Sequence, residues 1–411
     1  MSDTDKNSES GSGDVNSVEQ KHASQNIKPA TQTAHLGRAP FANHGFVNPP
    51  VFRGSTVLFP TLEALKTRNQ PFTYGRRATP TTRALEDAIA RLEGGEATIL
   101  TGSGLQAVTT ALLALVEAGD SILMVDTVYQ PTRSFCDTAL KRLGVETVYY
   151  DPLIGAGIKD LIKPNTRLIF TESPGSQTFE MQDIPAIANA ARAAGIWTVM
   201  DNTWASPLYF KPFAHGVDVS IQALTKYVVG HADAMLGAVT ANSRAAPFID
   251  RAKEALGTSP GSEETYLALR GLRTLDVRLA RHHQSALEVA HWLATRPEVR
   301  RVMHPALESD PGHAIWSRDF LGASGLFGFI LEPVSNTALA AFVDDLKLFG
   351  MGYSWGGYES LILPFNPSTY RTATPWRETG TAVRIHIGLE GVTDLIDDLE
   401  AGFSRMANAS S

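Results

Sequence analysis

The regular alternation of short apolar runs with amphipathic segments between residues 84 and 200 constrains the fold of this chain more than any other feature. Apolar runs of five or six residues are typical of buried strands, and the longer segments between them have helical spacing. We expect strands at 97–100, 121–125, 145–150, 166–171 and 196–200, and helices at 84–93, 105–116, 131–143 and 184–194. Strands that alternate with helices need right-handed crossovers, so the sequence predicts an α/β fold with a mainly parallel sheet covered on both faces.

The pattern changes on both sides of this region. A long helical stretch from Glu263 to about Thr295 is followed by strands and helices that no longer alternate strictly, which is typical of an α+β unit. Before residue 80 the chain is punctuated by prolines, and the first residues are polar, with isolated apolar side chains. We therefore expect four parts: a disordered tail at 1–28, an arm or clamp at 29–80, an α/β domain at 81–272 and a smaller C-terminal α+β domain at 273–411.

Composition argues against two classes of partner. The 411 residues carry 36 Lys and Arg against 43 Asp and Glu, a net charge of −7, whereas nucleic acids and anionic membranes select a basic surface. No run reaches the roughly 18 apolar residues of a membrane span. Cys136 is the only cysteine, so no disulfide can form within the chain, which suits a reducing compartment. We expect a cytoplasmic protein with neither nucleic-acid nor membrane partners.

The first candidate site is the segment Thr101-Gly102-Ser103-Gly104-Leu105-Gln106-Ala107, between a predicted strand and a predicted helix. Glycines let the backbone approach an anion, and a helix N-terminus offers free N–H groups. A tight turn without a ligand explains the same residues equally well. The glycine spacing also matches a dinucleotide fingerprint, with Asp126 near the place of a ribose-binding acid. A nicotinamide-dependent oxidoreductase is therefore an alternative.

Two further residues favour a different cofactor. Asp201 ends the apolar run 196–200, and Lys226 follows an alternating run around Val217–Ile221. Alone, Asp201 is compatible with a turn cap and Lys226 with a solvated surface. Their order after the glycine loop matches the needs of pyridoxal 5′-phosphate (PLP), which requires a phosphate loop, an acid at its ring nitrogen and a lysine for a Schiff base. A dinucleotide site leaves Asp201 and Lys226 unexplained.

Several motifs resemble those of the Cys/Met-metabolism family of PLP-dependent enzymes. They are Thr225-Lys226-Tyr227-Val228-Val229-Gly230-His231-Ala232-Asp233, Tyr74-Gly75-Arg76-Arg77, Asp201-Asn202-Thr203-Trp204 and Arg384-Ile385-His386-Ile387-Gly388-Leu389-Glu390. The resemblance runs from about residue 30 to about 407 and implies a PLP-dependent transferase-like fold of type I. Two more blocks, Glu172-Ser173-Pro174-Gly175-Ser176 and 353–360, resemble the β-eliminating members more than the γ-acting ones.

The resemblance implies a phosphate site shared between subunits. The N–H groups of Gly104 and Leu105 and the hydroxyl of Thr225 would bind the phosphate from one subunit, and Tyr74 and Arg76 would reach it from a neighbour. That arrangement implies at least a dimer, and the family implies a homotetramer. Ala223 departs from the family, because several members have a serine hydroxyl there.

The resemblance also implies the remaining roles. Lys226 and Tyr129 would be the catalytic residues, with Lys226 bound to the cofactor and Tyr129 stacked on its ring, while Asp201 would pair with the ring nitrogen. Arg384 would bind the substrate α-carboxylate in a pocket that Ser354 and Trp355 line.

The implied reaction is carbon–sulfur β-elimination of an amino-acid thioether, converting cystathionine to homocysteine, pyruvate and ammonia. A γ-acting relative, a nicotinamide oxidoreductase and a non-catalytic binding protein remain alternatives. We expect no metal site, because His282-His283 lacks the i, i+4 spacing of helical metal ligands and is compatible with a solvated helix face. Cys136 is expected to be a buried core thiol.

Overall fold

The computed structural model describes residues 27–410, so all but two residues of the predicted tail lie outside the described part. Its larger sheet has the strand order β1-β7-β6-β5-β4-β2-β3. The strands are β1 (Ala97–Thr101), β2 (Ser121–Val125), β3 (Glu146–Tyr150), β4 (Thr166–Glu172), β5 (Trp197–Asp201), β6 (Val219–Gln222) and β7 (Gly237–Ala241). Only β7 runs against its neighbours, so the predicted mainly parallel sheet is confirmed.

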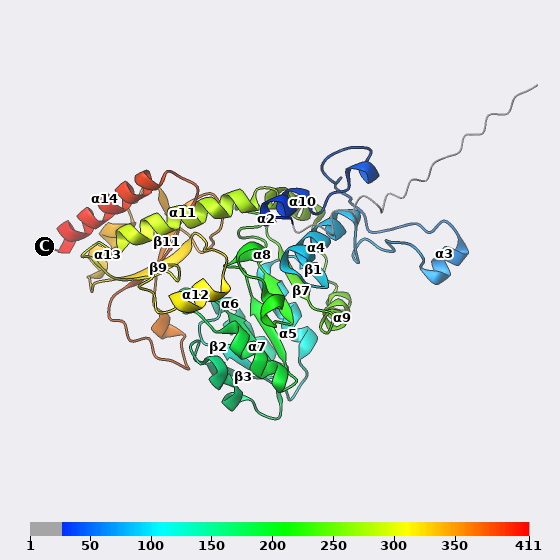
Figure 1. The fold of residues 1–411 in the computed structure, drawn as a ribbon, viewed down its shortest axis with the longest axis horizontal. Helices are drawn as coiled ribbons and strands as arrows, with labels where there is room; N and C mark the ends of the chain where they lie inside the picture. The colour runs from blue at the N-terminus through cyan, green and yellow to red at the C-terminus, as the bar shows by residue number, and fades with distance from the viewer. Residues whose placement is uncertain (1–26, 411) are drawn as a thin grey trace, which may run out of the picture.

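Helices cover both faces of this sheet because its strands are apolar on both sides (Figure 1). Ile99 of β1 packs in one core cluster with α5 (Gly104–Leu115) and α9 (Ala246–Leu256). The next residue, Leu100, packs in another cluster with α4 (Pro80–Glu93) and α10 (Ser262–Leu272). Successive strand residues point to opposite faces, so this single step along β1 separates the two helical layers.

A second, smaller sheet has the order β10-β11-β12-β9-β8. Its strands are β8 (Val299–Met303), β9 (Leu326–Leu331), β10 (Phe349–Met351), β11 (Ser360–Phe365) and β12 (Ala382–His386). Only the β10–β11 pair is parallel. One core cluster joins this sheet to α11 (Leu275–Leu293), α13 (Asn336–Val343) and α14 (Val392–Ser410). Figure 1 shows this yellow-to-red part beside the larger sheet.

The predicted single helix from Glu263 to about Thr295 is wrong, because α10 ends at Leu272 and α11 begins at Leu275. Next to this break, Gly271 lies against the backbone of Val228 and Val229, where a Cβ would come within 2.3 Å of a carbonyl oxygen. Arg278 then donates to the carbonyl of Gly271 at 2.8 Å and to that of Tyr227 at 2.7 Å. The carbonyl group at the break is therefore satisfied by a side chain.

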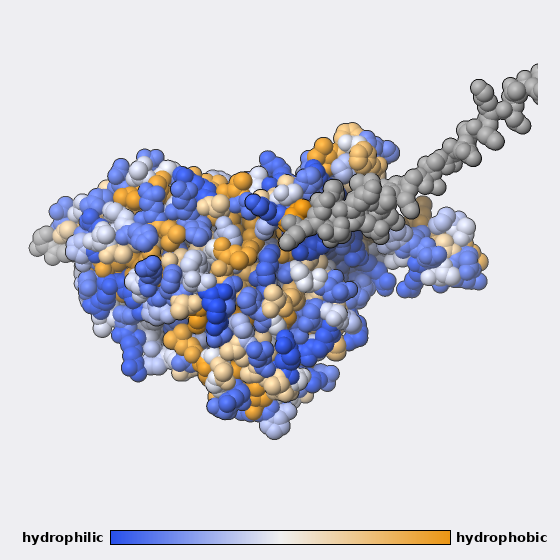
Figure 2. Space-filling view, viewed as in Figure 1, coloured by the Kyte–Doolittle hydropathy of each residue, from blue (hydrophilic) through white to orange (hydrophobic). Residues whose placement is uncertain are grey.

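The arm carries two short helices (Figure 1). Helix α2 (Pro29–His35) lies on the body against α11, whereas α3 (Leu62–Thr67) is in the part that extends away from the body. Apolar side chains are exposed along it: Phe41, Phe46, Val47, Leu58, Leu62 and Leu65. The space-filling view in Figure 2 shows the projecting arm beside the compact body. Among residues 27–410, no helix combines the length and apolar character needed to span a membrane.

Candidate active site

Six parallel strands of the larger sheet end at the same edge, and each predicted cofactor residue of the body follows or ends one of them. The glycine loop follows β1, Tyr129 follows β2, Asp201 ends β5 and Lys226 follows β6. The smaller sheet adds Arg384 from β12, together with Ser354 and Trp355 from the loop after β10. Ligands in open α/β sheets bind beyond the carboxyl ends of the strands, so these residues define a candidate site between the two sheets.

Lys226 joins the two sides of this site. Its Nζ donates to Ser354 Oγ at 2.9 Å and lies 5.1 Å from the centroid of the Trp355 ring. Burial and, to a lesser extent, the charge of Arg384 lower the pKa of Lys226 to about 8, with Asp201 opposing them. The amine is thus neutral far more often than an ordinary lysine, which suits a nucleophile and general base.

Asp201 is held at its strand end by the turn that follows. Its Oδ1 accepts the N–H of Thr203 at 3.0 Å, and Thr203 Oγ1 accepts the N–H of Ala223 at 2.9 Å. Burial raises the pKa of Asp201, whereas the bonds from Thr203 and the charge of Lys226 lower it. The carboxylate can therefore accept a cationic N–H partner without leaving its place.

The glycine loop lies directly against the segment that leads to Lys226. Ser103 caps α5 by accepting the Gln106 N–H at 3.1 Å. The first backbone bond of the helix is donated by Ala107 to the Ser103 carbonyl, so the N–H groups of Gly104 and Leu105 have no carbonyl partner within the helix. A Cβ on Gly104 would lie 2.5 Å from the Cβ of Ala223. Glycine is thus required for the close approach of loop and segment. Thr225 Oγ1 already bonds the backbone of Leu236, accepting its N–H at 2.9 Å and donating to its carbonyl at 3.1 Å.

Arg384 is buried in the site, whereas Tyr129 is 44% exposed. Arg384 donates from Nη2 to the carbonyls of Gly352 at 2.8 Å and Ser354 at 3.2 Å, which fixes the guanidinium. Burial lowers the pKa of Arg384 to about 10, so it stays cationic at neutral pH. The Tyr129 phenol has its pKa raised by burial and by Asp201, with Arg384 opposing, which places its hydroxyl within the field of both.

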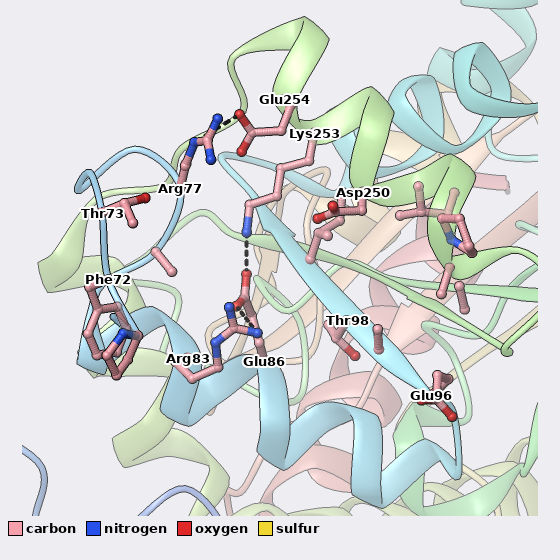
Figure 3. A pocket seen from close by; sticks show the side chains of 18 residues that line it. Phe72, Thr73, Arg77, Arg83, Glu86, Glu96, Thr98, Asp250, Lys253 and Glu254 are labelled. Atoms are coloured by element: carbon pink, nitrogen blue, oxygen red, sulfur yellow. Dashed lines mark hydrogen bonds and ion pairs between the residues drawn. The ribbon is translucent and has the colours of Figure 1, made fainter. Parts of the chain in front are cut away.

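The structure does not bring Tyr74 and Arg76 into this group of residues. Arg76 contacts Glu254 of α9 in its own chain, with Nη2 3.4 Å from Oε2, and Tyr74 pairs with Thr56 in an isolated bridge. A separate cavity of about 520 Å³ lies here, between the arm, α4 and α9. Figure 3 shows Arg77 pointing to Glu254, and Lys253 meeting Glu86 across this cavity.

The alternative role of Asp126 as a ribose ligand is not supported. Asp126 is fully buried and accepts Arg133 Nη2 at 2.7 Å together with the N–H groups of Thr372, Ala373 and Thr374 at 3.0 Å each. These donors occupy both oxygens, so the carboxylate ties the loop before β12 to the end of β2. The hypothesis of a dinucleotide site therefore lacks an acidic residue that is free to bind the ribose.

The expectation of a solvated face at His282-His283 is wrong for His282, which is fully buried. Its Nδ1 bonds the Ile387 carbonyl at 2.7 Å, and its ring lies 5.3 Å from Tyr227 and 5.2 Å from His386. His386 accepts the Gly356 N–H on Nε2 at 3.1 Å and so holds the loop that carries Ser354 and Trp355. The two-residue spacing of Arg384 and His386 could have identified this support, because it places both on one face of a strand. Cys136 is buried, as expected.

Comparisons with known proteins agree with this geometry. The family described as Cys/Met metabolism PLP-dependent enzyme matches residues 30–404. Cystathionine beta-lyase MetC of Escherichia coli (strain K12) is 46% identical over 387 residues, covering 92% of this chain and 98% of that protein. Cystathionine beta-lyase of Salmonella typhimurium has the same identity and coverage. The crystal structure of cystathionine gamma synthase from Xanthomonas oryzae pv. oryzae in complex with cystathionine superposes with a TM-score of 0.86 at 29% identity, covering 94% of this chain and all of that one.

Proposed function

Since the chain belongs to the Cys/Met metabolism family of PLP-dependent enzymes, we propose that it is a carbon–sulfur lyase acting by β-elimination on L-cystathionine. Its products would be homocysteine, pyruvate and ammonia, and the reaction would be a step in methionine biosynthesis. The observation that carries the proposal is the contact of Lys226 with Ser354, which joins the reactive lysine to the block that resembles the β-eliminating members. Relatives named cystathionine beta-lyase at 46% identity support the same substrate.

The residues of this site fit PLP. The α5 N-terminus offers N–H groups to a phosphate, Asp201 offers a buried carboxylate to the ring nitrogen, and Lys226 offers an amine whose pKa is near 8. The bound cofactor would supply an electron sink for the negative charge that develops at the substrate Cα. Tyr129, from the loop after β2, would cover one face of the ring.

The side chains of the site would orient the substrate and transfer its Cα proton. Arg384 would hold the substrate α-carboxylate through a paired hydrogen bond, which fixes the orientation of the bonds at Cα. The Lys226 amine would remove the Cα proton and return it to the leaving sulfur, and the Ser354 hydroxyl would keep that amine in reach. Trp355 would shield the amine from water on the side of the smaller sheet.

A γ-acting relative is the second candidate, because solved structures with that activity superpose closely. The experiment is an assay of the purified holoenzyme on L-cystathionine and L-cystine, with separate detection of pyruvate and 2-oxobutyrate. Pyruvate with homocysteine is expected from cystathionine. Formation of 2-oxobutyrate with cysteine would show that the enzyme catalyses γ-elimination instead of β-elimination. If neither substrate gives an oxo acid, the lyase proposal is wrong.

We also propose that the protein acts in the cytoplasm as a homo-oligomer, at least a dimer and by family resemblance a tetramer. Tyr74 and Arg76 would contact the cofactor phosphate of a neighbouring subunit. The distance of the arm from its own site and the exposed apolar side chains along it support this proposal.

A further inference from the structure

One acidic residue at the edge of the site has no role in the proposed reaction. Glu172 ends β4 and is in direct register with Asp201 at the end of β5. Its N–H is fixed by Gln182 Oε1 at 2.9 Å, and its Oε2 accepts the backbone N–H of Tyr129 at 2.8 Å. A carboxyl at a strand end of the cofactor sheet thus holds the residue proposed to stack on the cofactor.

Tyr129 needs an external support. It precedes the short helix α6 (Gln130–Phe135), and its own side chain makes no capping bond there. The side chain is also 44% exposed, so packing alone does not fix the ring. The bond from its N–H to Glu172 therefore fixes the direction in which its Cα–Cβ bond leaves the backbone.

The segment that follows Glu172 reinforces the same contact. Ser176 donates its N–H to the carbonyl of Thr127 at 2.9 Å, and Gly175 lies so close to Thr127 that a Cβ would come within 2.3 Å of Oγ1. The loop after β4 thus holds the loop after β2 at two points, Thr127 and Tyr129. Gly175 is the residue that permits this close approach.

The contact needs the reach of the side chain more than its charge. Burial raises the pKa of Glu172 well above its usual range, and the charge of neighbouring Asp201 raises it further. A protonated carboxyl still has a carbonyl oxygen that accepts an N–H. A glutamine at this position offers the same acceptor at the same distance, whereas an aspartate is shorter by one methylene.

We propose that Glu172 is a positioning residue that fixes the Tyr129 ring over the cofactor by accepting the Tyr129 N–H. The inference rests on the proposed placement of Tyr129 on PLP and is independent of the substrate. It differs from a general structural role because it acts only through Tyr129.

The test compares Glu172→Gln with Glu172→Asp in the full-length holoenzyme without substrate. The readouts are the dissociation constant for PLP and the visible circular dichroism of bound PLP, which reports how the ring is held. We expect Glu172→Gln to stay within about twofold of the wild type. Glu172→Asp should bind PLP roughly three- to tenfold more weakly, the loss expected for one hydrogen bond, with a reduced dichroic band.

A Tyr129→Ala background provides the control. There, Glu172→Asp should change the PLP dissociation constant no further, because the group it positions is gone. Wild-type behaviour of Glu172→Asp, a Glu172→Gln defect as large as that of Glu172→Asp, or an undiminished effect in the Tyr129→Ala background would each overturn the proposal. If the wild-type protein shows no visible band of bound PLP, the cofactor assignment itself is wrong.

Discussion

At the scale of single residues, the proposed chemistry depends on how the fold changes the proton affinity of Lys226. Water stabilises an exposed ammonium, and the site removes much of that water and adds the positive charge of Arg384. Asp201 offsets this only in part. The result is an amine whose pKa is about 8 instead of the ordinary 10.5, close to the pH at which the reaction must run.

This shift predicts a pH dependence for cofactor capture by the apoenzyme. Below pH 8 the amine is mostly protonated, and its neutral fraction falls roughly tenfold for each unit of pH. The second-order rate of PLP capture, followed by stopped-flow absorbance, should therefore rise from pH 6 to about 8 and level off above it. A rate that keeps rising to pH 10 would contradict the lowered pKa.

Two variants serve as controls for that measurement. Lys226→Ala should give no visible band of covalently bound cofactor and no turnover, because no other amine takes its role. Arg384→Gln should move the plateau to higher pH, because it removes the positive charge that disfavours the ammonium.

The sequence predicted the residues proposed to face the cofactor more readily than those that support them. Asp201 and Lys226 were predictable because each lies just beyond a run of apolar residues, where the sheet must present its edge. Glu172 and His386 occupy similar places, yet their roles depend on a backbone N–H from another segment, Tyr129 or Gly356. The strand spacing of Arg384 and His386 places both side chains on one face, but the segment that each supporting residue contacts leaves no signal in the chain.

At the scale of elements, a buried ion pair joins α4 to α9. Lys253 Nζ lies 2.8 Å from Glu86 Oε1, and the two side chains are only 8% and 2% exposed (Figure 3). Burial raises the pKa of Glu86, with Lys253 opposing. Removing the lysine alone leaves a buried carboxyl whose remaining counter-charge is the half-exposed Arg83 at 3.7 Å, and that is the costly change.

We expect Lys253→Ala to lower the free energy of unfolding by about 3 kcal/mol at pH 7, measured by urea denaturation. The exposed pair of Lys163 and Glu146, 3.2 Å apart, is the matched control, and Lys163→Ala should cost less than about 1 kcal/mol. Replacing both partners, Glu86→Leu with Lys253→Met, should recover most of the stability. Equal effects of the buried and the exposed lysine would contradict the role of burial.

The predictability of an element depended on whether its side chains showed a period. Strand β2 was predicted to the residue, because Ser121–Val125 lies between clear turns. Strand β7, Gly237–Ala241, was missed because its residues are small and all five are buried, so neither bulk nor alternation marks it. The helix predicted at 131–143 changes to π-helical hydrogen bonding at Cys136–Leu140, a backbone feature that periodicity does not resolve.

At the scale of the whole molecule, buried histidines make folding sensitive to acid. Burial lowers the pKa of His282 to about 4 and that of His304 to about 3. In the unfolded chain both titrate near 6.5, so below that pH the unfolded state binds more protons than the folded one. Their contribution to stability is present above about pH 6.5 and is lost as pH falls towards 4.

Each histidine should therefore remove about 2 kcal/mol of stability between pH 7 and pH 5. Buried carboxyls with raised pKa, such as Glu86, act in the opposite direction, so the effect is best isolated with a variant. His304→Asn retains an acceptor for the Ala306 N–H that now bonds Nδ1 at 3.1 Å. Urea denaturation at both pH values should show a smaller acid loss in this variant, and an unchanged loss would contradict the role of His304.

The exposed apolar side chains of the arm are the basis of the proposed oligomer. Leu58 is 84% exposed and Phe41 82% exposed, which is costly for an isolated chain and expected for a surface that another subunit covers. A carboxylate buried at such an interface loses its hydration without gaining a partner. Leu58→Glu and Phe41→Glu should therefore shift the protein towards smaller species in sedimentation velocity, whereas Leu321→Glu, at a 68% exposed position outside the arm, should not.

Dissociation should also weaken the cofactor site if, as we propose, Arg76 binds the phosphate of a neighbouring subunit. In its own chain Arg76 is engaged by Glu254, so a separated subunit has no arginine from the arm at its phosphate site. The PLP dissociation constant of Leu58→Glu should therefore reach the wild-type value only at protein concentrations that restore the oligomer. Arg76→Ala, in contrast, should weaken PLP binding at every protein concentration. A dissociated variant that binds PLP as tightly as the wild type would show that the phosphate site is complete within one chain.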